Sequence, residues 1–514
     1  MAITLVQLPN NQSVPVITNW TPMTGYMVFS NTNNSSLFYQ KLILRVRLGD
    51  ITGEIVALMK QRGNGYSVDI QNNNARAFFD VREIANAQVV DTYFNQNCDG
   101  APFQSIHTVG ASTGTNSSSG TQLTALPFSV NGNRSQAKFQ IVKLHVQAGE
   151  ESSTSISASP TSTFNVTAQG QDNQYYLQAS LPLEAPRFVT GGGGSVNTTY
   201  IQGIAFNSFR LTSSASRFLS TIIPTEFTVG GTNINGYRNN VFFDTDTNQG
   251  DLHTLAFLNG SAFNSEGASM EVEYFDSSNS SIGSYAFDNL DTTGGYSPYV
   301  TPTDDGQRLL YFGCGPGNLQ AQSDNTSARP SNNSSFVYYT VQAKSATSGG
   351  GSDRSAKYYF FKDNSCTKFV QSKRRLAFIN SVGGYDYLNF TMRNTQTIDI
   401  KRDNYDKMLG VFSGSKYRYD NADRGTTTVK VHSKIKETLQ SDYIPQSQGQ
   451  LFADLFLSRR VDMLVSFMSG STQVNVVYPV VVTDNSFVIK KSETDGLIQY
   501  TVNIEYANPY NNNS

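Results

Sequence analysis

The segment from Asp244 to Asp251 is the part of the chain that is most similar to a metal-binding loop. Oxygen-bearing side chains that alternate in a tight loop can converge on Ca²⁺, which binds many oxygen ligands at once. Two positions argue against calcium: Gly250 comes one place late for the helix-loop-helix calcium pattern, and Leu255 stands where a bidentate glutamate should close the site. We therefore predict a polar turn between strands, with calcium as the weaker interpretation. The candidate ligands are Asp244, Asp246, Asn248 and Asp251.

Two further motifs contain residue types that bind phosphate. The run Lys373-Arg374-Arg375 could bind a phosphate or an acidic partner surface. Three basic residues at a strand edge more often stay in water or protect the edge from pairing, and we favour that interpretation. The run from Gly313 to Gly317 has the glycines of a phosphate loop, but no Lys-Ser or Lys-Thr pair follows it, so it is more typical of a tight turn.

Catalytic chemistry has few candidate residues. The histidines lie in unrelated contexts and no Gly-x-Ser-x-Gly motif occurs, so the sequence offers no Ser/His/Asp triad. The cysteines are odd in number and widely spaced, which is typical of buried thiols and not of a disulfide framework or a zinc site. No pair among the 40 acidic residues is distinguished as a glycosidase pair. We predict no catalytic activity and no cofactor. The residues concerned are His107, His145, His253, His432, Cys98, Cys314 and Cys366.

Composition limits the partners of the chain. Its 514 residues include 38 Lys and Arg against 40 Asp and Glu, a net charge of −2, and only 15% are charged. This balance gives no field that would steer the protein to nucleic acid or to an anionic membrane. No apolar run is long enough for a membrane-spanning helix. We expect no specific nucleic-acid partner and no membrane insertion.

Alternation with a period of two dominates the sequence and predicts strands. Leu42, Leu44 and Val46, for example, share one face of a strand. Helical patterns are few: the best runs from 450 to 460 with two arginines in its last turn, and a shorter one runs from 81 to 90. The predicted fold class is mainly β, a multi-domain β-sandwich of the Ig-like or jelly-roll type, with a C-terminal β-sheet plus one helix module.

Four stretches rich in Gly, Ser and Thr interrupt the strand patterns, at 110–120, 150–162, 191–199 and 345–352. Such stretches cannot bury apolar area, so they are linkers or long loops. We use the first and the last as boundaries and interpret the middle two as loop insertions. The predicted units are an N-terminal β domain (1–108), a linker (109–123), a middle β domain with loop insertions (124–344) and a C-terminal β domain with one helix near 450–460 (345–514).

The last strand is predicted to carry a contact between subunits. Its apolar face alternates with polar residues, and a polar tail follows it. A sheet that ends with this strand would leave an edge of unpaired N–H and C=O groups, and such an edge must be covered. In a ring, the neighbouring subunit would cover it. The predicted interface residues are Ile498, Tyr500, Val502, Ile504 and Tyr506.

Several short motifs follow one another in an order that is similar to a known group of proteins. They are Phe38 to Leu48, Phe78 to Ile84, Leu309 to Pro316, Cys366-Thr367-Lys368, Arg375 to Phe390, Leu451 to Ser458 and Glu505-Tyr506-Ala507. In this order they resemble structural virion proteins of tailed phages, best represented among phages of Bacteroidetes, including the crAss-like phages, and among marine phages. The glycines of these motifs permit tight turns, and the aromatic residues fill a sandwich core.

The resemblance implies a non-enzymatic component of the virion neck, tail or baseplate, made in the host cytoplasm and built into the virion. We expect it to assemble with copies of itself and with other virion proteins into a symmetric ring or tail sub-structure, through interfaces and strand addition. Two alternatives stay open. One is a receptor- or carbohydrate-binding adhesin whose aromatic residues stack on a host-surface glycan, and the other is a virion-associated glycan hydrolase with two converging carboxylates.

Overall fold

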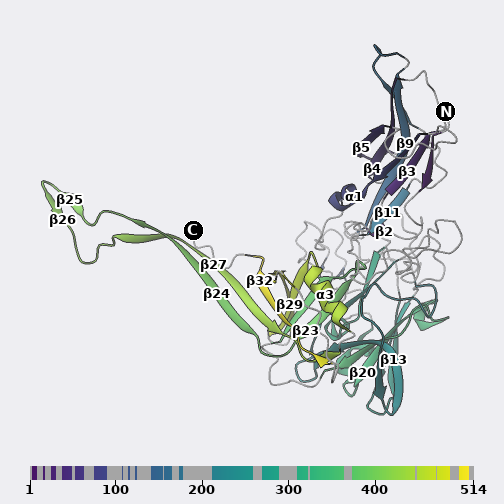
Figure 1. Cartoon of the computed structure of the whole chain (residues 1–514). Coiled ribbons are helices and arrows are strands. Elements are labelled where there is room, and N and C mark those ends of the chain that lie inside the picture. The colour runs from purple at the N-terminus through teal and green to yellow at the C-terminus, as the bar shows by residue number, and fades with distance from the viewer. Residues whose placement is uncertain are drawn as a thin grey trace.

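Most of the residues that the structure describes form β-sheets, as the alternating patterns predict (Figure 1). The chain is described from a computed structural model that covers residues 3–7, 16–17, 25–30, 38–48, 52–62, 75–88, 107, 114–115, 122–123, 141–153, 155–164, 173–177, 211–258, 269–288, 309–321, 325–363, 373–445, 448–469, 472–484, 486 and 497–508. Everything below concerns these residues. Trp20, Cys98, Cys366 and the stretch 191–199 lie outside them.

The N-terminal unit is a sandwich of two sheets that share one core. Its alternating apolar residues are buried: Leu42, Leu44 and Val46 on one sheet face Phe79 on the other. The first sheet has the order β1 (Ile3–Gln7), β3 (Gly25–Ser30), β6 (Ala75–Asp80). The second has the order β2 (Val16–Ile17), β11 (Asn173–Leu177), β9 (Ile141–Ser153), β4 (Phe38–Leu48), β5 (Ile55–Arg62), with β10 (Thr161–Phe164) paired to β9. Helix α1 (Arg82–Gln88) lies within the predicted helix 81–90.

The predicted boundary after residue 108 is wrong. Strands β9 and β11 come after the predicted linker 109–123, yet they return to pair beside β4 in the N-terminal sheet. The linker itself contains the short pair β7 (Gly114–Thr115) and β8 (Gln122–Leu123). His107, assigned by prediction to the N-terminal domain, is buried against Tyr387 and Asp462 of the C-terminal sheet. The low-complexity composition indicates a loop at this point. The extent of the structural unit is set instead by the strands on both sides of the loop, which pair in one sheet.

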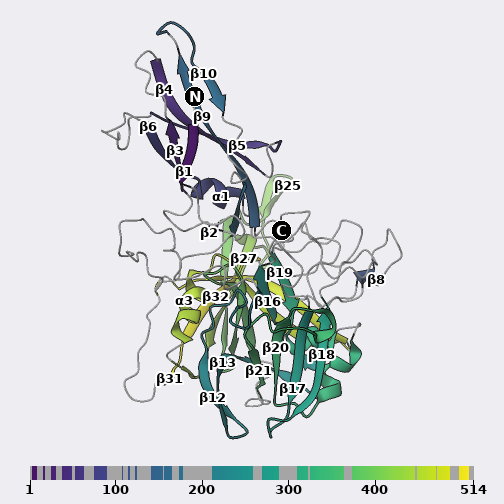
Figure 2. The same ribbon diagram turned by 90° about the vertical axis from the view of Figure 1, so that its right-hand side faces the viewer.

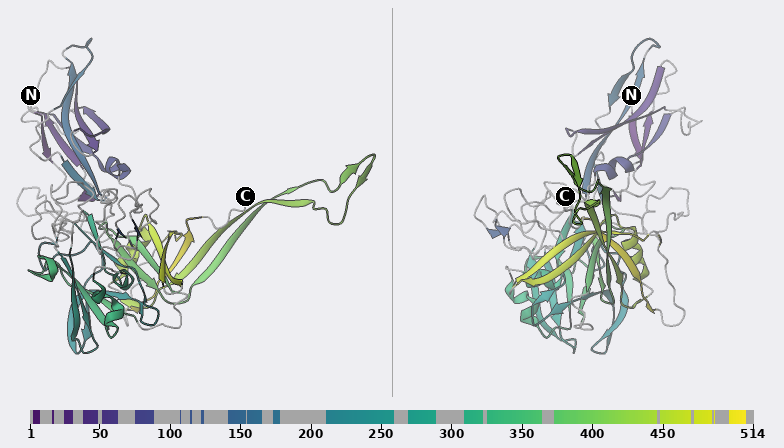
Figure 3. Two further views of the ribbon diagram at one scale, coloured as in Figure 1. Left: turned by 180° about the vertical axis from the view of Figure 1, so that it is seen from behind. Right: turned by 90° about the vertical axis from the view of Figure 1, so that its left-hand side faces the viewer.

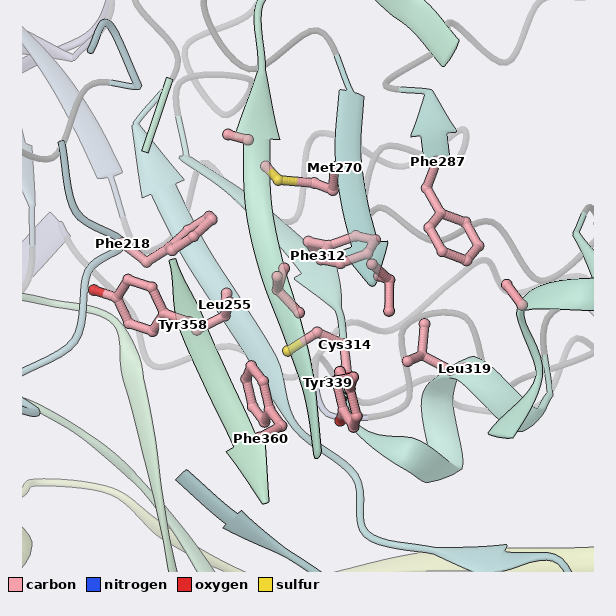
Figure 4. Packing of buried hydrophobic residues seen from close by; sticks show 14 of the residues in the cluster. Phe218, Leu255, Met270, Phe287, Phe312, Cys314, Leu319, Tyr339, Tyr358 and Phe360 are labelled. Carbon is pink, nitrogen blue, oxygen red and sulfur yellow. Dashed lines mark hydrogen bonds between the residues drawn. The ribbon is translucent and has the colours of Figure 1, made fainter. Parts of the chain in front are cut away.

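The middle unit is one six-stranded sheet with a strand pair packed on its face. The sheet has the order β12 (Thr225–Val229), β13 (Thr232–Val241), β21 (Tyr358–Lys362), β20 (Tyr338–Lys344), β17 (Ser269–Phe275), β18 (Ser281–Asp288). The covering pair is β16 (Thr254–Leu258) and β19 (Leu309–Gly313), followed by α2 (Pro316–Gln320). Phe218, Phe312, Tyr339 and Phe360 fill the space between the layers (Figure 4), where Tyr339 and Phe360 stack at 5.0 Å.

The C-terminal unit is a seven-stranded antiparallel sheet. Its order is β23 (Tyr385–Phe390), β22 (Arg374–Ile379), β29 (Val461–Ser469), β30 (Thr472–Val482), β32 (Thr501–Tyr506), β27 (Thr426–Gln440), β24 (Thr395–Asp406). The predicted helix is present as α3 (Gly449–Leu457), and its buried Leu451, Phe452 and Leu455 join the core of this sheet. The helix ends before Arg459 and Arg460, so these arginines do not lie in its last turn as predicted.

The second predicted boundary, at residue 345, is also wrong. Residues 345–352 form a turn inside the hairpin of β20 and β21, and β21 lies in the middle of the six-stranded sheet. The parallel pairing of β21 with β13 joins residues that are more than a hundred positions apart, so no local pattern could reveal it. The remaining short elements are β14 (Phe243–Asp244), β15 (Gln249–Gly250), β28 (Ile444–Pro445), β31 (Leu497–Ile498) and the 3-10 turns Thr326–Ala328, Pro330–Asn333 and Thr347–Gly349.

The last strand is internal and not an edge, contrary to the prediction. Strand β32 pairs with β27 on one side and with β30 on the other. Its apolar side chains point into the core of their own subunit, with Val502 and Ile504 fully buried. The edges of the sheet are β23 and β24, and β24 belongs to a long hairpin inserted earlier in the chain.

Strands β24 and β27 leave the body as a two-stranded arm (Figures 1 and 3). The arm is residues 395–440, and its tip, residues 407–425, carries the small pair β25 (Val411–Ser413) and β26 (Lys416–Arg418). Twelve residues of β24 span about 40 Å at the usual rise per residue. The N-terminal sandwich lies at another end of the molecule (Figure 2).

A substitution at Gly384 would test how tightly the segment before β12 packs on the turn between β22 and β23. A Cβ atom at Gly384 would lie 1.9 Å from the carbonyl oxygen of Leu219. Gly384→Ala should therefore lower the free energy of unfolding by about 1–3 kcal/mol, measured by urea titration. The control is Gly425→Ala, where the new Cβ would meet Leu409 Cδ2 at 3.4 Å, an ordinary contact. Equal stability of the two variants would contradict this packing.

Candidate functional site

The arm is the most exposed part of the described chain. All twelve residues of β24 are exposed, including Ile398 and Ile400. The tip presents an apolar cluster in which Phe412 is 72% and Tyr419 is 68% exposed. The rings of Phe412 and Tyr417 lie 5.3 Å apart, so the cluster is partly ordered by its own contacts. The large exposed apolar side chains of the tip are Met408, Leu409, Val411, Phe412, Tyr417 and Tyr419.

Cross-strand side-chain pairs hold the two strands of the arm in register. Thr426 donates a hydrogen bond to Asp406 and Thr428 donates one to Asn404. Nearer the body, Lys436 forms an ion pair with Asp399 at 2.6 Å. Exposed pairs of this kind each stabilise a strand pair only slightly. Because β24 is exposed along its whole length, these pairs set the register of the arm but add little to its stability.

The root of the arm is fixed by a buried carboxylate. Glu437 of β27 is 2% exposed and accepts hydrogen bonds from Arg374, from Tyr506 and from Gln396. The Arg374 guanidinium approaches it at 2.8 Å. Because one carboxylate joins β22, β32, β24 and β27, the arm leaves the sheet from a rigid base.

The arm differs in charge from the rest of the chain. Its 46 residues include nine Lys and Arg against six Asp and Glu, a net charge of +3. The rest of the chain keeps 29 Lys and Arg against 34 Asp and Glu, a net charge of −5. The arm and the rest of the chain thus carry net charges of opposite sign.

A pocket of about 290 Å³ lies where the middle sheet meets the C-terminal sheet. Strands β12, β13 and β23 and helix α3 supply its walls. Leu451 and Phe452 give it an apolar floor, and Glu226 and Asp442 stand exposed at its rim beside Tyr443, which is 60% exposed. The pocket is thus acidic at the rim and apolar below.

A buried charge cluster lies beneath the pocket. Asp251 accepts from Lys373 at 2.7 Å and from Arg375 at 3.3 Å. Burial acts to raise the pKa of Asp251, but the two cations outweigh it and hold the pKa below the ordinary carboxyl value. Arg375 also donates to the Leu252 carbonyl, to Asn389 and to His253. The cluster therefore joins the loop after β15 to strands β22 and β23.

Two buried histidines extend this cluster. Arginine can only donate, so Nδ1 of His253 accepts from Arg375. Burial, reinforced by the nearby Arg375 charge, lowers the pKa of His253 well below its ordinary value. His107 lies between the Tyr387 hydroxyl at 2.9 Å and Asp462 at 3.3 Å, and burial lowers its pKa although Asp462 opposes the shift. The Thr254 hydroxyl lies 2.6 Å from the Tyr387 hydroxyl and extends this hydrogen-bonded network.

One side chain of the pocket has an unused donor. Asn239 lines the pocket, is 6% exposed, and its Nδ2 has no hydrogen-bond partner within the described residues. A buried donor without a partner costs about 1–3 kcal/mol, so an acceptor that enters the pocket would recover that free energy. Asn239 is thus the polar group that a bound segment would satisfy first.

Two buried carboxylates lie near each other elsewhere, as a glycan hydrolase would require. Burial raises the pKa of Asp386 and of Asp454. Asp386 accepts from Ser220, Thr221 and Asn380, and Asp454 accepts from Ser381 and Gln450. Neither lines the pocket. Their hydrogen bonds tie the segment before β12 to the C-terminal sheet and α3, which is a structural role.

The structure divides the predicted metal ligands. Asp244 accepts from the Asp246 amide and from Thr247, as in a polar turn, and Asn248 adopts a left-handed backbone with φ of 58°. Asp251 instead turns inward to Lys373 and Arg375. The predicted turn between β14 and β15 is confirmed. No cluster of three or more His, Cys, Asp or Glu suited to a metal ion occurs among the described residues.

The basic run 373–375 is not a solvated edge, so that interpretation is wrong. Its side chains alternate, because successive residues of a strand point to opposite faces. Lys373 and Arg375 reach Asp251, while Arg374 reaches Glu437 at the root of the arm. The arm itself was missed at the sequence level. The feature that could have revealed it is its high density of charge. Of its 46 residues 15 are charged, which is about twice the share of 15% in the whole chain.

Comparisons with known proteins add no assignment. No protein-family model matches the chain, and no curated protein matches it. Among the described helices, none has the length and apolar character needed to span a membrane.

Acidification should destabilise the protein through its buried histidines, His107 and His253. Because the folded pKa of His107 and His253 is lowered, the unfolded state binds more protons below about pH 6.5, and stability falls as the pH drops through that value. Each fully shifted histidine contributes up to about 1.4 kcal/mol per pH unit. His253→Gln, which keeps an acceptor for Arg375, should flatten the dependence measured by urea titration between pH 7 and 5.5. His432→Gln, at a half-exposed histidine of the arm, is the control for the loss of a histidine.

Calcium should not stabilise the turn between β14 and β15. The Asp251 carboxylate is already bound by two cations, so it is not offered to a metal. Millimolar Ca²⁺ should leave the melting temperature unchanged, since any ligand specific for the native state raises it. A rise that Asp246→Ala removes would show that the turn binds calcium after all.

Proposed function

We propose that the protein is a non-enzymatic structural component of a tailed-phage virion, in the neck, tail or baseplate. In this proposal it assembles through protein interfaces, and the arm makes the principal contact between subunits. The observation that carries the proposal is the arm: a long hairpin, rooted in a rigid sheet, with an exposed apolar tip. The order of the motifs from Phe38 to Ala507 supports the assignment to a virion.

The arm needs a partner on physical grounds. A two-stranded hairpin is marginally stable in water by itself, because it buries little apolar surface. Contiguous exposed apolar side chains, such as Phe412 and Tyr419, mark surfaces that bind other macromolecules. Assembly would bury the apolar tip. Exposing the apolar tip to water in the free subunit is unfavourable in free energy, and burial of the tip in the particle would offset this.

A second candidate is a receptor-binding adhesin. The exposed aromatic rings of Phe412, Tyr417 and Tyr419 at the tip of a projecting arm also suit stacking on sugar rings of a host-surface glycan. The two candidates predict different defects when the tip is altered. Loss of an assembly contact would keep the chain out of the particle, whereas loss of an adhesin would prevent the particle from binding to the host surface.

Replacing the aromatic tip should abolish assembly without unfolding the body. The variant combines Phe412→Ser, Tyr417→Ser and Tyr419→Ser, and the amount of the chain found in purified virions after complementation in trans should fall at least about tenfold. The melting temperature should not change, because these side chains contribute nothing to the core. Calorimetry and quantitative gel analysis of particles measure the two effects.

The matched control replaces three exposed apolar residues of the N-terminal sandwich, with Ile55→Ser, Leu58→Ser and Ile156→Ser. It should enter particles normally. If the tip variant enters particles as well as the control but the particles no longer adsorb to host cells, the adhesin replaces the assembly role. Normal incorporation with normal adsorption would refute both candidates.

A further inference from the structure

Resting on the proposed function, we infer that the arm tip of one copy docks into the pocket of the next copy of the same chain. The donor surface is residues 407–425, and the acceptor is the pocket between β12, β13, β23 and α3. The contact is head-to-tail, because an arm meets a pocket and not another arm.

A molecule cannot fill its own pocket with its own tip. The arm leaves the body on the side away from β13 and the middle sheet, and its tip lies far from α3 in both views that show its full length (Figures 1 and 3). The root held by Glu437 and Arg374 prevents the hairpin from swinging back. The tip and the pocket are therefore available to different molecules.

Charge favours a pairing of tip and pocket over a pairing of two tips. The tip carries four basic residues against two acidic ones, a net charge of +2. The pocket is acidic: Glu226, Asp363 and Asp442 line it with Arg238 and Arg375. The lining thus has three acids against two bases. Two tips brought together would repel each other, whereas tip and pocket attract.

The apolar surfaces match as well. Interfaces are dominated by aromatic anchors that fill desolvated pockets inside a polar ring. Phe412 is the most exposed aromatic residue of the tip, and the pocket offers Leu451 and Phe452 below the exposed Tyr443. A volume of about 290 Å³ is at the lower end for ligand pockets, so it suits one side chain of a partner protein.

The unused amide of Asn239 supplies an independent reason to expect an occupant. It is buried in the pocket wall and has no acceptor among the residues that the structure describes. The turn of the tip, Ser413-Gly414-Ser415, brings hydroxyl and carbonyl oxygens next to Phe412. When Phe412 enters the pocket, an oxygen of this turn accepts from Asn239 Nδ2. The contact then satisfies both the apolar and the polar requirement of the site.

A head-to-tail contact has a consequence for assembly. Each copy carries one arm and one pocket, so every copy can bind two neighbours through the same contact. Heterologous contacts of this kind generate a ring when the rotation between neighbours closes. The direction of the arm relative to the pocket then sets the number of copies in the ring.

A charge swap tests the inference. In the full chain, Lys416→Glu with Arg418→Glu reverses the tip, and Glu226→Lys with Asp442→Lys reverses the rim. Each pair of changes should weaken self-association at least about tenfold in sedimentation velocity across a concentration series, and the chain that carries all four changes should associate as the wild type does. Glu54→Lys, an exposed acid of the N-terminal sandwich, is the control and should associate normally.

The outcomes separate the inference from the function it rests on. If the tip reversal abolishes association and the rim reversal does not restore it, the arm is an assembly contact but the pocket is not its acceptor. If the tip-reversed chain binds the wild-type chain better than either binds itself while rim changes have no effect, the tips pair with each other. A wild-type chain that stays monomeric throughout overturns the copy-to-copy contact. Tip reversal without effect on association or on incorporation into virions refutes the arm as an assembly element.

Discussion

The ion cluster of Asp251, Lys373 and Arg375 is the contact on which the arrangement of the middle and C-terminal sheets depends. Burying charges is costly, and the cost is recovered only when every polar atom finds a partner in good geometry. Arg375 meets this requirement through a carbonyl, an amide, a carboxylate and a neutral histidine. A network of this kind tolerates one relative position of the two sheets. Removing one member of a buried pair typically costs about 3–5 kcal/mol, so sliding of the sheets is strongly opposed.

The run Lys373-Arg374-Arg375 also connects this rigid contact to the arm. Lys373 and Arg375 lie on the face that meets the middle unit, and Arg374 lies on the opposite face, where it binds Glu437. One short piece of strand therefore connects the loop after β15, the C-terminal sheet and the root of the hairpin. A projecting arm is useful for assembly only when its direction is fixed, because a flexible arm loses entropy on docking. The buried ion cluster and the arm are thus connected through one strand, and the cluster helps to fix the direction of the arm.

Sequence patterns predicted the local elements better than their connections. Period-two alternation located β4 and β32, and helical spacing located α3, because these patterns reflect which side chains face a core. The unit boundaries failed, since β9 and β21 return to sheets begun far earlier in the chain. Pairing over such separations depends on tertiary packing. The pocket and Asn239 were missed for the same reason, and the arm was missed because an exposed hairpin alternates much as a buried strand does.

The proposed assembly also requires that the arm does not pair indiscriminately with other chains. Strand β24 is one edge of its sheet, and a long flat edge normally invites pairing with other chains. Along this edge, Asp399, Lys401 and Asp403 place charges of alternating sign among the exposed apolar residues. Such charges disfavour the addition of a further strand, because an arriving backbone would have to desolvate them. In the proposed assembly, recognition therefore lies in the side chains of the tip, where Phe412 and its neighbours meet an acidic pocket. Under this proposal the specificity of the interface comes from side-chain chemistry at the end of the arm, and strand addition, the mode expected from the sequence, is disfavoured along its length by the charges of β24.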